Sequence, residues 1–175
     1  MAFSSPSDIL ERLGVHEGQV LADLGAGSGF YTFAAAKIVG PAGTVYAVEI
    51  QKEVLARLAN HARYEHLTNI HFLHGDVDRL RGSHIADNSV DTVLACNVLF
   101  QIENTAAFVA EVKRILKSGG RVLVVDWAGS FGSTGPQPQY VVTAAAAEEF
   151  FTKAGFTKVN TIPAGDHHWG LIFRK

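Results

Sequence analysis

The chain has 175 residues, of which 47% are hydrophobic and 18% are charged. This composition is too apolar for an intrinsically disordered protein, and the length favours a single domain, residues 1–175, that starts with a short helical segment at residues 1–18. Fifteen lysines and arginines nearly balance seventeen aspartates and glutamates, and no run of basic residues predicts a nucleic-acid or membrane partner. The composition leaves the oligomeric state open.

Cysteine usage and the first residues bear on the cellular compartment. Cys96 is the one cysteine of the chain and has no second thiol for an intramolecular disulfide. The opening MAFSSPSDIL lacks the basic start and the apolar stretch of a secretion signal. No apolar run reaches the roughly 20 residues that span a bilayer. We therefore expect a cytoplasmic protein without a membrane anchor.

The first part of the chain predicts an alternation of helices and strands. Helices are expected at 6–14, 30–40 and 52–64, and strands at 19–24, 43–50, 69–76 and 89–97. The helix at 52–64 carries Val54, Leu55 and Leu58 on one face, and the helix at 30–40 is closed by Gly40.

The second part continues the alternation. Segment 103–120 predicts a helix closed by a glycine pair, and 121–127 predicts the most apolar strand of the chain. Segment 128–140 is rich in glycine and proline and predicts a long mobile loop. A helix at 143–156, with Thr143 as its N-cap and Gly155 as its stop, and two closing strands at 158–163 and 167–175 complete the chain. The alternation predicts an α/β fold with a largely parallel sheet and helices on both faces.

The stretch VLADLGAGSGF, residues 20–30, carries the first functional motif. After an apolar strand, Gly25, Gly27 and Gly29 form a turn that precedes a helix. Glycine permits a sharp turn and the close approach of a ligand to the backbone amides. The dinucleotide fingerprint requires glycine at the sixth position, where this chain has Phe30. The turn therefore predicts a nucleotide-like ligand and disfavours NAD(P).

Two carboxylates follow at the ends of the next two strands. Glu49 in VYAVEI is placed to accept hydrogen bonds from both hydroxyls of a ribose. Asp76 in HGDVD is placed to accept one from an amino group such as that of adenine. Either carboxylate alone would equally fit a solvated strand end. Together with the glycine turn, and in this order, they favour an adenosine-containing ligand.

Four segments, VLADLGAGSGF, VYAVEI, GDVDRL and ILKSGGRVLVVDW, resemble the ordered motifs of the class I S-adenosylmethionine-dependent methyltransferases. The similarity covers roughly residues 15–175 and is greatest for the small-molecule branch that includes the quinone-biosynthesis and arsenite methyltransferases. It implies a Rossmann-like, doubly wound, seven-stranded sheet, order 3-2-1-4-5-7-6, mostly parallel with the last strand antiparallel. It also implies S-adenosylmethionine as cofactor, S-adenosylhomocysteine as product, and in-line methyl transfer to a small-molecule acceptor.

The resemblance assigns the residues around the cofactor. Glu49 would hold the ribose hydroxyls, Asp23 would contact the methionine end directly or through water, and Asp76 would read the adenine. The full set implied by the family motifs is Asp23, Gly25, Ala26, Gly27, Glu49, Ile50, Asp76, Val77 and Asn97. In this set Ile50 would pack on the adenine ring, and the carbonyl of Asn97 would face the methionine ammonium.

Candidate catalytic residues lie where an acceptor would bind. Ligands of open α/β sheets bind beyond the carboxyl ends of the strands, where Asp126 ends one strand and a reversed last strand would begin near His167 and His168. Asp126 would then orient one imidazole, which would serve as a general base. The sequence does not tell which histidine faces the pocket. The alternative is a polar hairpin tip beside a buried aspartate that only accepts hydrogen bonds.

The same three residues have the ligand types of a metal site. Adjacent histidines on a strand diverge, however, and no third spaced ligand is evident, so no metal is predicted. Cys96 is expected to be a small buried residue. Because arsenite methyltransferases use several cysteines, a single cysteine argues against arsenite as acceptor. An apolar or aromatic acceptor is predicted from the aromatic residues near the expected pocket: Phe3, Phe100, Trp127, Phe131, Tyr140 and Trp169.

Two alternatives to a methyltransferase stay open at this point. One is an S-adenosylmethionine-binding module without turnover, since the sequence contains neither an evident base nor a substrate-covering insertion. The other, less favoured, is an NAD(P)-dependent oxidoreductase, against which Phe30 and Asp76 argue. The acceptor and the methylated atom are not encoded in any motif of the chain.

Overall fold

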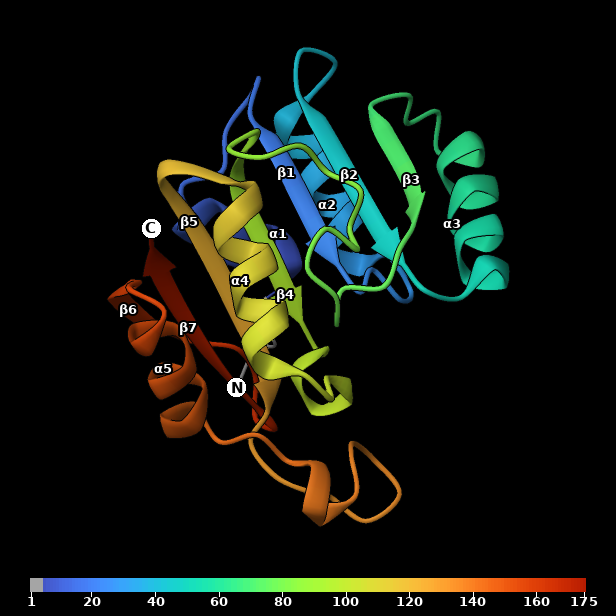
Figure 1. Ribbon diagram of the computed structural model, residues 1–175. Coiled ribbons are helices and arrows are strands. Elements are labelled where there is room, and N and C mark those ends of the chain that lie inside the picture. Colours follow the sequence, from blue (N-terminus) through green and yellow to red (C-terminus); the bar gives the residue numbers. More distant parts are fainter. Residues whose placement is uncertain (1–4) are drawn as a thin grey trace.

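The computed structural model describes residues 5–175, so Phe3, one of the expected acceptor contacts, lies outside the described residues. Within them the chain forms a seven-stranded sheet (Figure 1). From edge to edge the strands are β3 (Ile70–His74), β2 (Thr44–Glu49), β1 (Val20–Leu24), β4 (Val90–Cys96), β5 (Leu116–Trp127), β7 (His168–Arg174) and β6 (Thr157–Pro163). The predicted strand order is confirmed.

Strand direction decides which strand ends lie together. β1 to β5 run parallel to one another, whereas β7 runs antiparallel to both β5 and β6. In Figure 1 the arrowheads of β1 to β5 point to the same edge of the sheet, and β7 begins at that edge. This carboxyl edge is where open α/β sheets bind their ligands.

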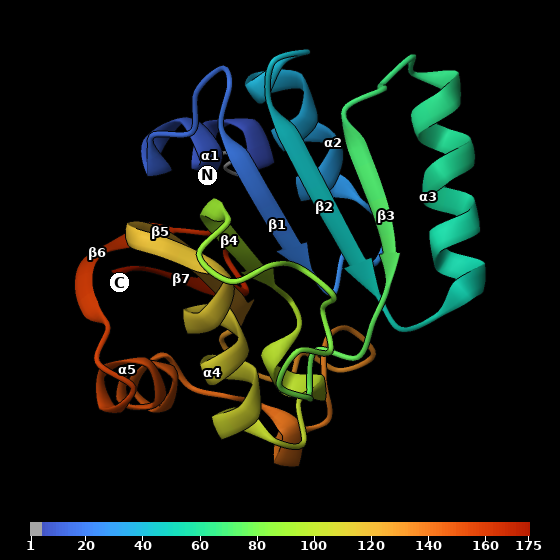
Figure 2. The same cartoon turned by 45° about the horizontal axis from the view of Figure 1, so that its top comes forward.

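Helices cover both faces of the sheet (Figure 2). The bounds are α1 (Pro6–Leu13), α2 (Phe30–Val39), α3 (Lys52–Tyr64), α4 (Thr105–Ile115) and α5 (Ala144–Lys153). Buried side chains of α1, α2 and α3 share one core with Leu123 and Val125 of β5, and those of α4 and α5 share another with Val122 and Val124. We call these two sides the α1–α3 face and the α4–α5 face. Alternation along the strands supplies apolar side chains to both.

Capping residues mark the ends of α1 and α5. Ser5 and Asp8 form a capping box at α1. The hydroxyl of Thr143 accepts a hydrogen bond from the amide of Ala146 at 3.2 Å, which confirms the predicted N-cap of α5. Gly155, with φ of +89°, follows the end of that helix. None of the helices among residues 5–175 combines the length and the apolar character needed to cross a membrane.

The predicted helix over residues 103–120 is wrong at its C-terminal end. α4 stops at Ile115, and Leu116 already pairs with β4 as the first residue of β5. The register then shifts before Arg121, and Gly119 in this interval has φ of +75°. The glycine pair therefore accommodates an irregularity in a strand. The same LKSGG pattern would also end a helix, so local sequence alone cannot separate the two.

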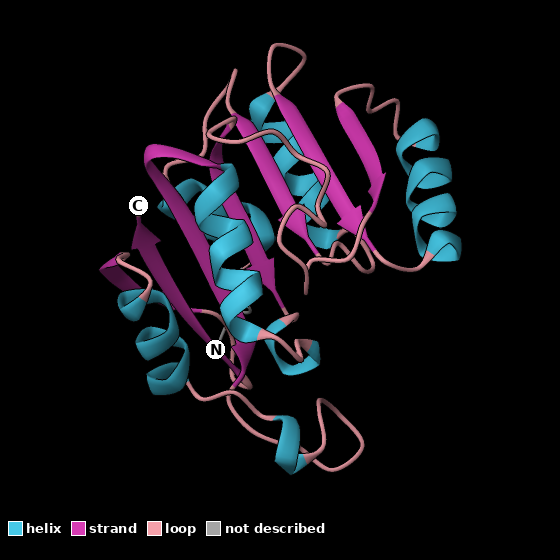
Figure 3. Cartoon of the chain, in the orientation of Figure 1, coloured by secondary structure: helices cyan, strands magenta, loops and turns pink. Residues whose placement is uncertain are grey.

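The glycine-rich loop 128–140 lies beyond the carboxyl edge (Figure 3). It contains a short 3-10 helix, η2 (Pro138–Tyr140), and an isolated bridge between Phe131 and Thr134. The amide of Ala128 donates a hydrogen bond to the carbonyl of His167 at 2.8 Å. This bond ties the start of the loop to the beginning of β7.

Candidate active site

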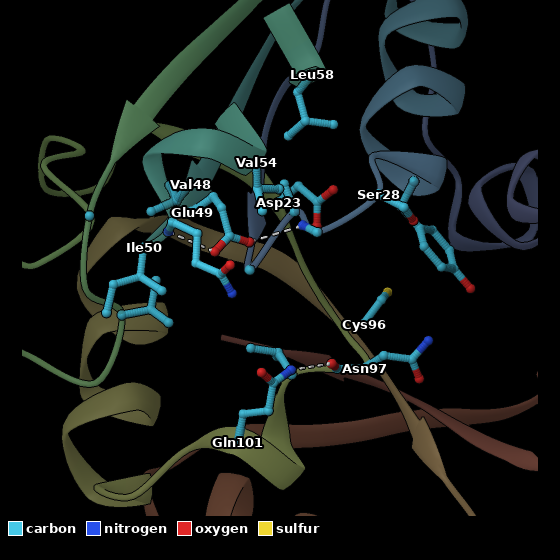
Figure 4. A pocket seen from close by; sticks show the side chains of 18 of the residues that line it. Asp23, Ser28, Val48, Glu49, Ile50, Val54, Leu58, Cys96, Asn97 and Gln101 are labelled. Atoms are coloured by element: carbon cyan, nitrogen blue, oxygen red, sulfur yellow. Dashed lines mark hydrogen bonds between the residues drawn. The ribbon is translucent and has the colours of Figure 1, made fainter. Parts of the chain in front are cut away.

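A cavity of about 830 Å³ opens at the carboxyl ends of β1 to β4 (Figure 4). Its volume lies within the range of roughly 300–1,000 Å³ that is typical of small-molecule sites. All nine residues assigned above to the cofactor line it: Asp23, Gly25, Ala26, Gly27, Glu49, Ile50, Asp76, Val77 and Asn97. The sequence therefore predicts where the cavity lies, and the role of each residue toward a ligand stays a prediction.

The turn between β1 and α2 forms one wall of the cavity. Gly25, Gly27 and Gly29 have φ of +79°, +51° and +83°. A β-carbon on Gly25 would lie 2.7 Å from the side chain of Val98, and one on Gly29 would lie 2.5 Å from that of Leu58. Both the backbone conformation and the packing therefore require glycine.

Glu49 ends β2 with its carboxylate held in the cavity wall. One oxygen accepts a hydrogen bond from the amide of Gly27 at 3.1 Å, and the other accepts one from the amide of Gln51 at 3.0 Å (Figure 4). The two main-chain donors come from the turns after β1 and after β2. They fix the orientation of the carboxylate, and each oxygen keeps acceptor capacity for a ligand hydroxyl.

Asp23 lies near the end of β1 and is buried. Burial is the main cause that raises its pKa to about 6, and the nearby charge of Glu49 raises it further. A hydrogen bond of 2.5 Å from the Thr32 hydroxyl acts in the opposite direction. A cation that enters the cavity would favour the charged carboxylate. The position thus suits a ligand with a positively charged group.

The segment after β3 brings Asp76 and Val77 to the cavity. The Asp76 carboxylate accepts a hydrogen bond from the amide of Asp78 at 3.1 Å and pairs with Arg79 at 2.9 Å. Ile50, which lines the same cavity, is 57% exposed although it is apolar. An uncovered apolar side chain and a hydrogen-bonding carboxylate in one cavity suit a flat ring that carries an amino group.

Two residues at the end of β4, Cys96 and Asn97, also line the cavity. Asn97 has φ of +55°, and its carbonyl accepts a hydrogen bond from the Gln101 side chain at 3.3 Å (Figure 4). Burial, with smaller contributions from Asp23 and Asp126, raises the pKa of the Cys96 thiol well above its usual value. The thiol is therefore protonated at neutral pH, in line with its expected structural role.

The structure corrects the expected pairing of Asp126 with a histidine. In the register of β5 and β7, Asp126 pairs with Trp169, and Trp127 pairs with His168. The side chain of Asp126 points to the α4–α5 face, where its carboxylate accepts hydrogen bonds from the amides of Leu99 and Trp127 at 2.8 Å each. Burial raises its pKa to about 6 despite these bonds. Asp126 caps the 3-10 helix η1 (Leu99–Gln101) and does not orient an imidazole.

The two histidines pack against aromatic rings and do not line the cavity. His168 lies against Trp127 on the α1–α3 face, with ring centroids 4.3 Å apart and the ring planes tilted by 40°, and His167 lies against Phe131 at 4.1 Å with a tilt of 35°. The Nε2 atom of His168 is buried and has no hydrogen-bond partner among residues 5–175. Burial, followed by the neighbouring His167, lowers the pKa of His168, so its ring is neutral at pH 7.

Helix α3 contributes a wall that sequence reasoning missed. Val54, Arg57, Leu58 and His61 line the cavity. Their spacing of i, i+3, i+4 and i+7 places them on one helical face, so the pattern itself contained the signal. The same spacing is also typical of a helix face that is buried in the core. Whether this face lines a cavity depends on how α3 packs against the sheet, which the spacing does not specify. In the part of the chain that the structure describes, no three His, Cys, Asp or Glu side chains gather as metal ligands.

Curated proteins of known function resemble this chain over part of their length. A family model for a methyltransferase domain matches residues 15–167. An arsenite methyltransferase from Halobacterium salinarum is 34% identical over 110 residues, which are 62% of this chain and 27% of that protein. A demethylmenaquinone methyltransferase from a Geobacillus strain is 27% identical over 68% of this chain and 50% of that protein. The chain thus spans a quarter to a half of the length of these relatives.

Solved structures resemble nearly the whole chain. A SAM-dependent methyltransferase from Aquifex aeolicus superposes with a TM-score of 0.88 at 25% identity, over 97% of this chain and 88% of that chain. Fibrillarin from Aeropyrum pernix superposes with a TM-score of 0.70 at 25% identity, over 91% of this chain and 67% of that one. The fibrillarin structure holds natively bound S-adenosyl-L-methionine. The cofactor in that structure is the one that the strand-end motifs of this chain imply.

Proposed function

The chain belongs to the class I S-adenosylmethionine-dependent methyltransferases, and on this basis we propose that it transfers a methyl group from S-adenosylmethionine to a small-molecule acceptor. The observation that carries the proposal is the geometry of Glu49. Its carboxylate is held by the amides of Gly27 and Gln51 in the wall of the cavity. Two fixed acceptor oxygens suit the two neighbouring hydroxyls of a ribose.

The other cavity residues fit the remaining parts of S-adenosylmethionine. The buried carboxyl of Asp23 suits the cationic methionine end, together with the carbonyl of Asn97. The exposed side chain of Ile50 offers an apolar surface to the adenine, and Asp76 offers an acceptor to its amino group. The turn at residues 25–27 lets the ligand lie against the backbone.

When bound, S-adenosylmethionine supplies a methyl group on a positively charged sulfur, so that an acceptor lone pair forms the new bond to carbon as the carbon–sulfur bond breaks. The residues of the chain contribute orientation and the exclusion of water. Tyr31 and Cys96 line the cavity close to Asp23, and the half-buried ring of Tyr31 shields this end from solvent. A protein base is needed only where the acceptor must lose a proton early.

We place the acceptor between this cavity and the neighbouring rings of Trp127 and His168. Both rings lie on the α1–α3 face, as does Cys96 of the cavity wall. Loop 128–140 packs on the indole, since a β-carbon on Gly135 would lie 2.8 Å from that ring. These surroundings favour an apolar or aromatic acceptor. Of the three candidate catalytic residues, His168 alone has a neutral ring, an Nε2 atom without a hydrogen-bond partner among residues 5–175, and a position on the same face of the sheet as Cys96 of the cavity wall.

Replacing His168 by alanine should lower turnover about 100-fold, because a positioned base contributes roughly 10²–10⁴ in rate. Turnover is measured as release of S-adenosylhomocysteine in the presence of a metabolite extract, and affinity for S-adenosylhomocysteine should stay unchanged. His71→Ala is the control, since His71 lies against Tyr46, with ring centroids 5.5 Å apart, on the distant strand β3. Undiminished turnover in His168→Ala would remove the histidine from the mechanism.

Arsenite is excluded from the proposal although one relative is an arsenite methyltransferase. Thiolate ligands for arsenic must be accessible and easily deprotonated. Cys96, the one cysteine in the sequence, is buried, and its thiol pKa is raised. We therefore propose an organic acceptor.

Titration calorimetry with S-adenosylmethionine, S-adenosylhomocysteine and NAD(P) tests the cofactor. Binding of the first two without the third is the expected result, and binding of NAD(P) alone would favour the oxidoreductase. Release of S-adenosylhomocysteine with a metabolite extract tests the transfer. Binding without turnover across broad extracts would contradict the enzyme and favour a non-catalytic binding module.

A further inference from the structure

Residues 75–87 form most of the connection between β3 and β4 and bring Asp76 and Val77 into the cavity wall. The segment is built from turns and has no helix or strand. Two of its residues other than glycine, Arg81 and His84, have φ of +66° and +60°. This left-handed conformation is unfavourable for residues with a side chain, so surrounding contacts must hold it in place.

Glu111 of α4 supplies these contacts from the α4–α5 face. Its buried carboxylate accepts hydrogen bonds from the amide of Arg81 at 2.7 Å and from the amide and hydroxyl of Ser83 at 3.1 and 2.5 Å. Arg114 donates two more bonds, at 2.8 and 2.7 Å, and so pairs the buried charge. Burial alone would raise the pKa of Glu111, but these donors lower it to about 2. The anchor is therefore ionised at neutral pH.

Gly82 connects this anchor to Asp76. It lies between the two residues whose amides Glu111 holds, and its carbonyl accepts a hydrogen bond from the amide of Asp76 at 3.1 Å. The backbones are in close contact, since a β-carbon on Gly82 would lie 1.9 Å from the carbonyl oxygen of Asp76. A displacement of Gly82 must therefore displace Asp76.

We propose that Glu111 is a positioning residue, which acts through Gly82 to keep Asp76 in contact with the adenine of the cofactor. The inference rests on the proposed function, because the adenine contact is part of it. Glu111 does not line the cavity. It influences affinity without touching the ligand.

The test is calorimetric titration of S-adenosylhomocysteine into the wild type and Glu111→Gln. Glutamine keeps the size of the side chain but removes its charge and points an amide donor at other donors. We expect a loss of affinity of about fivefold or more, because hydrogen bonds to a charged group are involved. If Glu111→Gln does not fold, Ser83→Ala removes one of these bonds and is expected to weaken binding about two- to threefold.

Two comparisons separate positioning from mere stability. In an Asp76→Ala background, Glu111→Gln should have little further effect on affinity, because both changes remove the same contact. S-inosylhomocysteine carries an oxo group in place of the adenine amino group. Glu111→Gln should weaken its binding less than that of S-adenosylhomocysteine.

Asp91→Asn is the matched control. Like Glu111, Asp91 accepts a hydrogen bond from a backbone amide, that of Val20 at 2.9 Å, and pairs with a basic side chain, that of Lys117 at 2.7 Å. It lies at the beginning of β4, away from the carboxyl edge. This variant should lower the unfolding temperature and leave the affinity for S-adenosylhomocysteine unchanged.

The outcomes distinguish this inference from the function on which it rests. Unchanged affinity in Glu111→Gln, with binding weakened in Asp76→Ala, would overturn the positioning role alone. Additive losses in the double variant would overturn the route through Asp76. Unchanged affinity in Asp76→Ala would contradict the adenine contact of the proposed function, and the positioning role with it.

Discussion

Alanine in place of Glu49 is expected to weaken binding of S-adenosylmethionine at least tenfold, measured by titration calorimetry. The change removes the acceptors proposed for both ribose hydroxyls. It also leaves the amides of Gly27 and Gln51 without their carboxylate partner and so loosens the turns after β1 and β2. Hydrogen bonds to a charged group contribute about 1.5–3 kcal/mol each, and about 1.4 kcal/mol corresponds to tenfold.

Glu49→Gln separates the loss of ligand acceptors from the loosening of the turns, because glutamine keeps one acceptor oxygen and the shape of the side chain. Its affinity should lie between those of the wild type and Glu49→Ala. Glu65→Gln serves as the control, since Glu65 pairs with Lys37 on the surface at 3.0 Å. Wild-type affinity in Glu49→Ala would show that the ribose is not held at the end of β2.

Affinity for S-adenosylmethionine is also expected to fall about tenfold between about pH 7.5 and about pH 5. The pKa of Asp23 in the empty protein is about 6, chiefly because of burial. One pH unit below this value, roughly a tenth of the carboxyl groups are charged. The ammonium of the ligand favours the charged form, so the ligand must displace a proton from Asp23 at low pH.

Titration calorimetry in buffers of different ionisation enthalpy measures how many protons are released when the ligand binds. Near pH 5 binding should release most of the Asp23 proton, near pH 8 it should release almost none, and Asp23→Asn should abolish the dependence. The stability of the empty protein depends on pH in the opposite direction. Since the folded pKa lies above the unfolded value of 3.8, the contribution of the protonated group to stability is complete below about pH 4 and is lost as pH rises through about 6. Proton release that persists in Asp23→Asn would place the titrating group elsewhere.

The sequence predicted the sheet well because its central strands are apolar on both faces. The apolar runs VLAC in β4 and VLVV in β5 indicate buried strands, and most connections between the parallel strands carry a helix that covers the sheet. The error at residues 116–120 has a local cause. A glycine pair after a helix is compatible with a C-cap and with an irregular strand, and the choice depends on how β5 pairs with β4.

The sequence could bring the proposed cofactor-binding residues together at one cavity, because these residues follow strand ends in a fixed order. It could not place the candidate catalytic residues, because their surroundings depend on the register of β5 and β7. That register pairs Trp127 with His168 and leaves Asp126 on the other face. Glu111 did leave a signal, a charged residue among the apolar positions of AFVAEVKRI. The residues that it anchors lie about thirty positions earlier in the chain, where no periodicity links them to a helix.

Two buried carboxylates outside the cavity lining, Glu111 and Asp126, hold loops that form part of its wall, and both act from the α4–α5 face. Trp127, His168 and the packed part of loop 128–140 lie on the opposite side. Substitutions on the proposed acceptor side should therefore leave the supports of the proposed cofactor side in place. Replacement of loop 128–140 by the corresponding loop of a related enzyme should change which molecule is methylated and leave the affinity for the cofactor unchanged.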